Sequence, residues 1–143
     1  MDGNDFIQFA GKLAASNTSG GAGYRSAASR AYYGAYHLAR QYLNDCGFFC
    51  HSANEHQWVQ RHFFYCTFQA ANDIGRMLGN LHETRKEADY DLQLVSVESQ
   101  SHAKTSVMRA SEISARLTAC QAPANLAQVK FEMEVYRTKA NVS

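Results

Sequence analysis

The feature that most constrains this chain is its scarcity of proline, the residue that most reliably ends a helix. The single proline among the 143 residues is Pro123. Upstream of it, apolar residues recur at intervals of three and four, and no stretch keeps the period of two that is typical of a half-buried strand. The sequence therefore predicts an all-α fold, an up-and-down helical bundle with an extra C-terminal helix after Pro123.

The same spacing predicts the helices one by one, within a single domain that spans residues 1–143. Before Pro123 they are expected at Asp5–Ala15 (capped by Asn4 or Asp5), at about Tyr24–Asp45, from about Ala53, at Phe68–Tyr90 and at Val97–Cys120. The glycine-rich segment Ser16–Gly23 is expected to be a flexible connector. The terminal helix has one apolar face, which we expect to contact a second copy or a partner: Leu126, Val129, Met133 and Tyr136.

Charge and cysteine content narrow the classes of function and location. Lys and Arg number 14 and Asp and Glu 13, so the formal net charge is +1, which argues against a broad, non-specific nucleic-acid binder and permits a local phosphate site. No apolar run is long enough to cross a membrane, and the acidic first residues lack the apolar core of a secretory signal. The four cysteines are too sparse for a disulfide framework. We expect a cytoplasmic protein with no membrane association.

Metal and cofactor sites are not predicted. Cys46, Cys50 and His51, with His56 and Cys66 nearby, are zinc-ligand types, but their spacing matches no closed four-ligand pattern. No glycine-rich phosphate loop follows a strand. His56 and His62 lie among aromatic residues, where packing or surface roles are favoured over ligation.

Two polar features stand out on the expected helices. Arg30, Tyr33 and His37 lie in one row along the face opposite the apolar arc of the long helix, with Gly34 beside them, and this row is either a solvated face or the start of a phosphate site. Arg85 falls within the apolar stripe of the Phe68–Tyr90 helix, which a charged residue seldom does without a partner.

Two neighbours on that helix bear on the role of Arg85. Asp89 lies one turn further on and is the expected carboxylate partner, which predicts that Arg85 is at least half buried. His82 lies one turn back on the flank of the same face. The pattern fits a structural ion pair and a functional site equally well.

Taken together, these stretches resemble the HEPN superfamily of small all-helical proteins. The resemblance rests on Ser29-Arg30-Ala31-Tyr32-Tyr33 and the residues up to Ala39, on His56, and on Leu81-x-x-x-Arg85-x-x-Ala88-Asp89-Tyr90, and it covers about residues 22–120, the expected core. It is closest to the short, single-domain prokaryotic branch often found beside a minimal nucleotidyltransferase.

The resemblance implies a toxin or defence-system component that acts on RNA, and the activity it implies is that of a metal-independent endoribonuclease with a composite site in a homodimer. Arg85 matches the family's catalytic arginine, whereas Tyr90 stands where the family's histidine would be. His37 would then be the acid or base and Arg30 and Arg85 the phosphate clamp, while Tyr33, His82, Asp89 and Tyr90 would help to bind substrate. No cofactor is implied. The alternative is a non-catalytic HEPN module that binds a nucleotidyltransferase partner or a nucleotide.

Overall fold

The computed structural model describes residues 1–141, and the last two residues of the expected 1–143 domain lie outside this range. Within it the chain forms six α-helices and one 3-10 helix, with no strand, which confirms the all-α prediction. None of the helices in this range is both long enough and apolar enough to cross a lipid bilayer. In order, the elements are α1 (Gly3–Ala15), α2 (Gly20–Asp45), α3 (Glu55–Phe64), α4 (Gln69–Tyr90), η1 (Val95–Glu98), α5 (Gln100–Gln121) and α6 (Pro123–Lys139).

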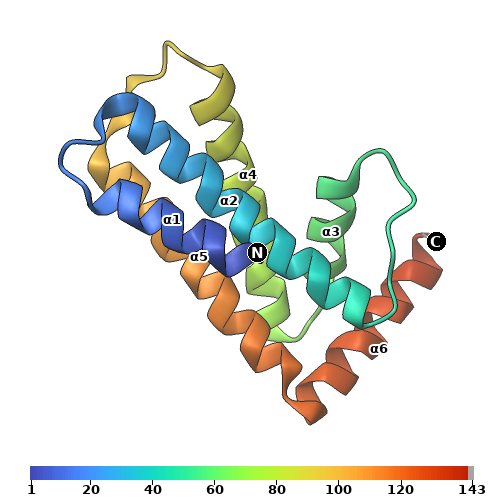
Figure 1. Cartoon of the computed structure of the whole chain (residues 1–143). Coiled ribbons are helices and arrows are strands. Elements are labelled where there is room, and N and C mark those ends of the chain that lie inside the picture. Colours follow the sequence, from blue (N-terminus) through green and yellow to red (C-terminus); the bar gives the residue numbers. More distant parts are fainter. Residues whose placement is uncertain (142–143) are drawn as a thin grey trace.

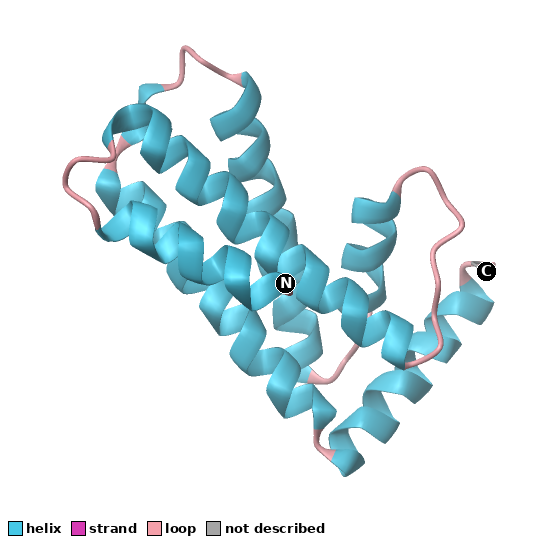
Figure 2. Ribbon diagram, in the orientation of Figure 1, coloured by secondary structure: helices cyan, strands magenta, loops and turns pink. Residues whose placement is uncertain are grey.

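Helices α1, α2, α4 and α5 form the bundle, and α2 packs against the other three (Figure 1). Helix α3 packs mainly on α4 and touches α2 near its own start, while α6 turns back from the end of α5 and reaches α3. Figure 2 shows that the segments between these helices are loops. The molecule therefore has a long bundle and, at one end, a shorter arm made by α3 and α6.

The α1 cap and the α1–α2 turn differ from the sequence prediction. Asp2, rather than Asn4 or Asp5, is the N-cap of α1, because its carboxylate accepts from the amide of Asn4 at 2.7 Å while Asp5 bonds back to the amide of Asp2 at 2.7 Å. Helix α2 begins at Gly20, so the second half of the expected flexible connector Ser16–Gly23 is helical. The Ser19 hydroxyl donates to the Leu13 carbonyl at 2.6 Å, which closes the turn tightly.

Gly34 lets α1 lie directly on α2. A Cβ on Gly34 would lie 2.6 Å from the Gly3 carbonyl oxygen and 2.6 Å from Cγ1 of Ile7. Gly34 is buried, so its expected place on a polar face is wrong: α1 covers that part of α2. The close approach explains a glycine in a helix interior, where it otherwise costs about 1 kcal/mol relative to alanine.

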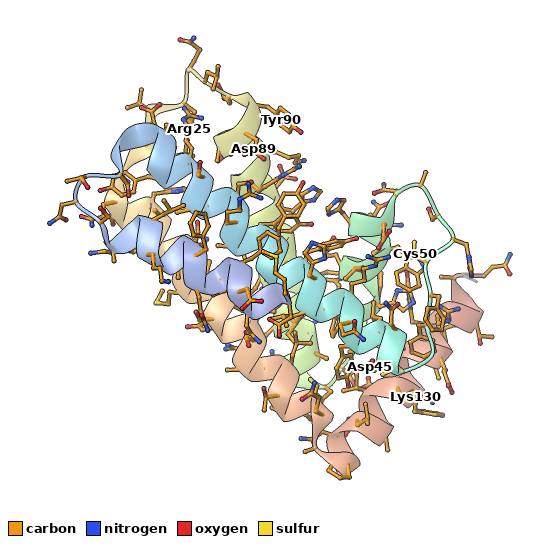
Figure 3. The ribbon with its side chains drawn as sticks, in the orientation of Figure 1. Arg25, Asp45, Cys50, Asp89, Tyr90 and Lys130 are labelled. Atoms are coloured by element: carbon orange, nitrogen blue, oxygen red, sulfur yellow. The ribbon has the colours of Figure 1, made fainter. Side chains whose placement is uncertain are left out.

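Arg25 on α2 holds the end of α4 and the segment that follows it. Its guanidinium donates to the carbonyls of Ala88, Asp91 and Leu94 at 2.9, 3.0 and 2.9 Å, and pairs with Glu98 at 3.0 Å. Figure 3 shows Arg25 at the level of the C-terminal end of α4. These carbonyls include groups that a helix end leaves without an internal partner, so one buried arginine satisfies them and fixes the loop.

The terminal helix uses its apolar face within the chain. Val129 and Met133 are fully buried in the main core, so the prediction that this face contacts another copy or a partner is wrong. Glu132 accepts from the amides of Thr67 and Phe68 at 2.7 and 3.1 Å and so ties α6 to the segment just before α4.

A buried histidine joins α6 to α3. The ring of His62 donates from Nδ1 to the Trp58 carbonyl at 2.7 Å, and its Nε2 accepts from Arg137 at 3.1 Å. This arrangement requires a neutral imidazole, since both ring nitrogens would carry protons in the charged form. Burial, which is complete for this side chain, lowers the pKa of His62 to about 4.

Candidate functional site

Three rings from three helices stack where α2, α3 and α4 meet. Tyr32 comes from α2, His56 from α3 and His82 from α4, and the ring of His82 lies 5.1 Å from the rings of both Tyr32 and His56, nearly parallel to each at 15°. The Tyr32 hydroxyl lies 2.5 Å from Nδ1 of His56. Side chains fill the space between these ribbons in Figure 3.

The hydrogen bond to Tyr32 assigns the proton on His56. Burial raises the pKa of Tyr32 above its ordinary value, so the phenol keeps its proton and donates it to Nδ1. In the neutral imidazole the proton then lies on Nε2, and His56 presents an N–H group on that side. No described residue hydrogen-bonds to either ring nitrogen of His82, so this imidazole is available as a proton acceptor.

Burial and neighbouring cations keep the histidines of this region neutral near pH 7. The pKa of His56 is lowered by burial and then by the charge of Arg85, and the pKa of His82 is lowered by burial and then by His56. Burial followed by the charge of Arg40 lowers the pKa of His37. Neutral imidazoles are the form that accepts a proton from a substrate hydroxyl.

Arg85 lies at the α2–α4 contact beside this stack, and its side chain is only 13% exposed. Its Nε lies 3.0 Å from the Asp89 carboxylate, which confirms the predicted burial and the predicted partner. Its guanidinium also donates to the Tyr33 hydroxyl and lies over the rings of Tyr33 and Tyr90, at 5.0 and 5.5 Å from their centroids. Ser29 donates to Asp89 at 3.1 Å. The arginine is thus held by a carboxylate, a phenol and two aromatic faces.

The structure brings most of the predicted residues together but not all of them. Tyr33, Asp89 and Tyr90 surround Arg85, and His82 lies one turn away on α4, whereas Arg30 and His37 point toward α1. There they contact Phe6, at 5.9 Å for the Arg30 guanidinium and 5.7 Å for the His37 ring. His37 remains linked to the cluster by its 6.3 Å stacking contact with Tyr33. Within the described residues of one chain, Arg30 lies over Phe6 and Arg85 over Tyr33, so the two arginines do not form a joint phosphate clamp.

His56 is the site residue that sequence reasoning placed among packing or surface residues. Its ring stacks on Tyr36 at 4.4 Å in addition to its bond with Tyr32. An ion pair between Glu55 and Arg40 draws the start of α3 onto α2 and so positions His56. His56 reaches the site only because the start of α3 lies against α2. Its place in the family resemblance was the one signal in the sequence that pointed to it.

The rings leave little free space between them. The cavity that Tyr32, Tyr36, His56 and His82 help to line has a volume of about 10 Å³, which is at the lower limit for one water molecule. A substrate would therefore meet the edges of the rings rather than enter between them. Among residues 1–141, no three His, Cys, Asp or Glu side chains are grouped so as to hold a metal ion.

Comparison with known proteins gives no match: no protein-family model, no curated protein and no solved structure is similar to this chain.

Proposed function

We propose that this chain is a HEPN-like module that acts on RNA as a metal-independent endoribonuclease, within a toxin or defence system. The observation that supports this best is the contact between two neutral imidazoles, His56 and His82, whose rings lie 5.1 Å apart beside the buried Arg85. Cleavage of RNA without metal needs a base for the ribose 2′-hydroxyl and donors for the charge that develops on phosphorus. The residues for both roles are present.

The proposed reaction uses one histidine as a proton shuttle. His82 accepts the proton of the 2′-hydroxyl, the 2′-oxygen attacks phosphorus, and the bond from phosphorus to the 5′-oxygen breaks. The imidazolium of His82 then returns the proton to the leaving 5′-oxygen. The products are a 2′,3′-cyclic phosphate and a 5′-hydroxyl, and the Nε2–H of His56 and the guanidinium of Arg85 donate to the phosphate oxygens. DNA is inert because it lacks the attacking hydroxyl.

The proposal includes a homodimer, as the family resemblance implies. Three apolar side chains lie exposed on the end of α4 and the segment after it, and the first of them contacts Arg85: Tyr90 at 72%, Leu92 at 71% and Val95 at 71%. An exposed apolar group of this kind favours contact with another protein surface. A second copy seated there would lie beside the site. Light scattering that gives about twice the monomer mass of 16.0 kDa would support the dimer, and a purely monomeric species would count against it.

A specific observation also favours a non-catalytic module that binds a nucleotidyltransferase partner or a nucleotide. The charge of Arg85 is already matched by Asp89, and its Nη2 is already bonded to Tyr33, which reduces its capacity to hold phosphate. In addition, Tyr90 replaces the expected histidine.

An RNA-cleavage assay in excess chelator separates the two functions. We expect the protein to cut a single-stranded RNA and to leave an all-DNA strand of the same sequence intact. His82→Gln should reduce the cleavage rate by at least about 100-fold with an unchanged melting temperature. His51 lies exposed in a loop, so His51→Gln is the matched control and should cleave RNA at the parent's rate. No cleavage, or equal cleavage by His82→Gln, refutes the ribonuclease proposal and leaves the binding module.

A further inference from the structure

Residues at the end of α3 and on the outer face of α6 line a groove that shares no residue with the His56–His82 stack. Figure 1 shows these two helices together in the arm of the molecule. Its volume is about 620 Å³, within the range of small-molecule sites. Its walls are mainly aromatic and apolar, and its rim carries cations; the lining residues include Arg61, Tyr65, Phe131, Val135, Tyr136 and Lys139. None of them belongs to the candidate site described above.

One wall of the groove is a flat aromatic surface. Tyr65 and Tyr136 stack with their ring centroids 5.0 Å apart and their planes at 13°. Tyr136 is held from behind by an edge contact with His62 at 5.2 Å, while Tyr65 is 55% exposed. Phe131, 65% exposed, adds a second apolar surface. Tyr65 also meets Phe64 edge-on at 5.2 Å, and the part of its ring that stays exposed can contact a planar ring without any change in the core.

The cations of the groove have no carboxylate partner among residues 1–141. Arg61 from α3 and Lys139 from α6 are both exposed, and neither forms an ion pair in that range. The one carboxylate in the lining is Glu132, and it is already bonded to Thr67 and to the amide of Phe68. The groove thus combines an exposed aromatic platform with two unpaired positive charges on separate helices.

We infer that this groove binds a nucleotide, with the base stacked on Tyr65 and the phosphate between Arg61 and Lys139. The aromatic surface accounts for the base, and the two cations account for an anionic group at its edge. This inference goes beyond the proposed endoribonuclease activity, since the two sites share no residue and either can exist without the other.

Calorimetry with adenosine 5′-monophosphate as the probe tests the inference on the full chain. We expect one molecule bound per chain, with adenosine and inorganic phosphate each binding at least about tenfold more weakly, because each lacks one of the two recognised groups. Arg61→Gln, Lys139→Gln and Tyr65→Leu should each weaken binding by about tenfold. Arg61 and Lys139 are exposed and form no ion pair in the described range, so their variants should melt at the parent's temperature, whereas Tyr65→Leu loses its contact with Tyr136 and should melt slightly lower.

Lys104→Gln is the matched control, because Lys104 is exposed on α5 outside the groove and makes no ion pair in the described range. Its affinity should equal that of the parent. The inference is overturned by any of three results: no binding at millimolar probe, equal binding of adenosine and the monophosphate, or binding unaffected by all three groove variants. If benzoate binds as well as the monophosphate, the groove recognises an aromatic carboxylate and the nucleotide assignment is wrong. RNA cleavage by His82→Gln is scored separately, so the two proposals can fail independently.

Discussion

Acid should loosen this fold through His62, whose neutral ring joins α3 to α6. The folded chain lowers the pKa of His62 to about 4 because the ring is fully buried and faces Arg137, whereas the unfolded chain has the ordinary value of about 6.5. Between these values the unfolded state binds a proton that the folded state does not. The free energy of unfolding therefore falls as the pH drops from about 7 to about 4, and His62 adds no further change below that.

The size of the effect follows from the same two pKa values. One pKa unit corresponds to about 1.4 kcal/mol, so the His62 contribution that is lost by pH 4 is about 3 kcal/mol. That is a large part of the 5–15 kcal/mol by which domains of about this size are commonly stable. The pKa values of His37, His56 and His82 are also lowered, so they act in the same direction, and the test has to isolate His62.

Urea denaturation of the parent, His62→Gln and His62→Leu at several pH values isolates the contribution of His62 to the free energy of unfolding. Neither replacement titrates, and glutamine keeps one donor and one acceptor for Trp58 and Arg137. We expect both variants to lose about 3 kcal/mol less than the parent between pH 7 and pH 4, whatever their stability at pH 7. Parallel profiles for the parent and both variants would refute the reasoning, because the parent would then gain no extra acid sensitivity from His62.

Substitutions at Arg25, Gly34 and Arg85 test the packing, with Arg30→Gln as a control. Arg25→Gln should lower the free energy of unfolding by about 3 kcal/mol, because it leaves buried carbonyls without donors, whereas Arg30→Gln on the exposed face of the same helix should change it by less than about 0.5 kcal/mol in urea denaturation. Gly34→Ala should destabilise by about 2 kcal/mol despite the higher helix propensity of alanine, since its Cβ meets the backbone of α1; an increase in melting temperature would contradict the close approach. Arg85→Ala should cost about 2 kcal/mol because Asp89 loses its ion-pair partner, and Arg85→Lys, which keeps the positive charge, should recover most of that in thermal denaturation.

The sequence predicted the features that depend on local spacing. The Phe68–Tyr90 helix is observed as Gln69–Tyr90, and the Arg85–Asp89 pair follows from an interval of four residues on it. The break before α5 was missed: Val97–Cys120 was expected as one helix, but Ser99 caps a new helix by accepting from the amide of His102 at 3.1 Å. Serine is a common cap and also occurs within helices, so periodicity alone did not separate the two roles.

The features that were missed depend on residues distant in the chain. The partners of Arg25 are mostly backbone carbonyls more than 60 residues away, and carbonyls leave no mark in a sequence. His56 enters the site because α3 returns to α2, and its bond to Tyr32 spans 24 residues. Likewise, the row of Arg30, Tyr33 and His37 was interpreted as one face, but α1 covers part of it, so Arg30 lies over Phe6 of α1 while Arg85 lies over Tyr33. Helix spacing shows which residues share a face and does not show which neighbour covers that face.

Acid protonates histidines at both ends of the molecule, and this affects how the pH dependence of RNA cleavage is interpreted. His82 in the candidate site and His62 in the arm are both kept neutral by burial, so acid charges the proposed base over a range in which it also weakens the attachment of α6. A loss of RNA cleavage in acid would therefore have two causes, a protonated base and a loosened fold. His62→Gln removes only the second cause. If the proposed chemistry at His82 is correct, the acid limb of the cleavage rate remains in that variant while the acid loss of stability becomes smaller.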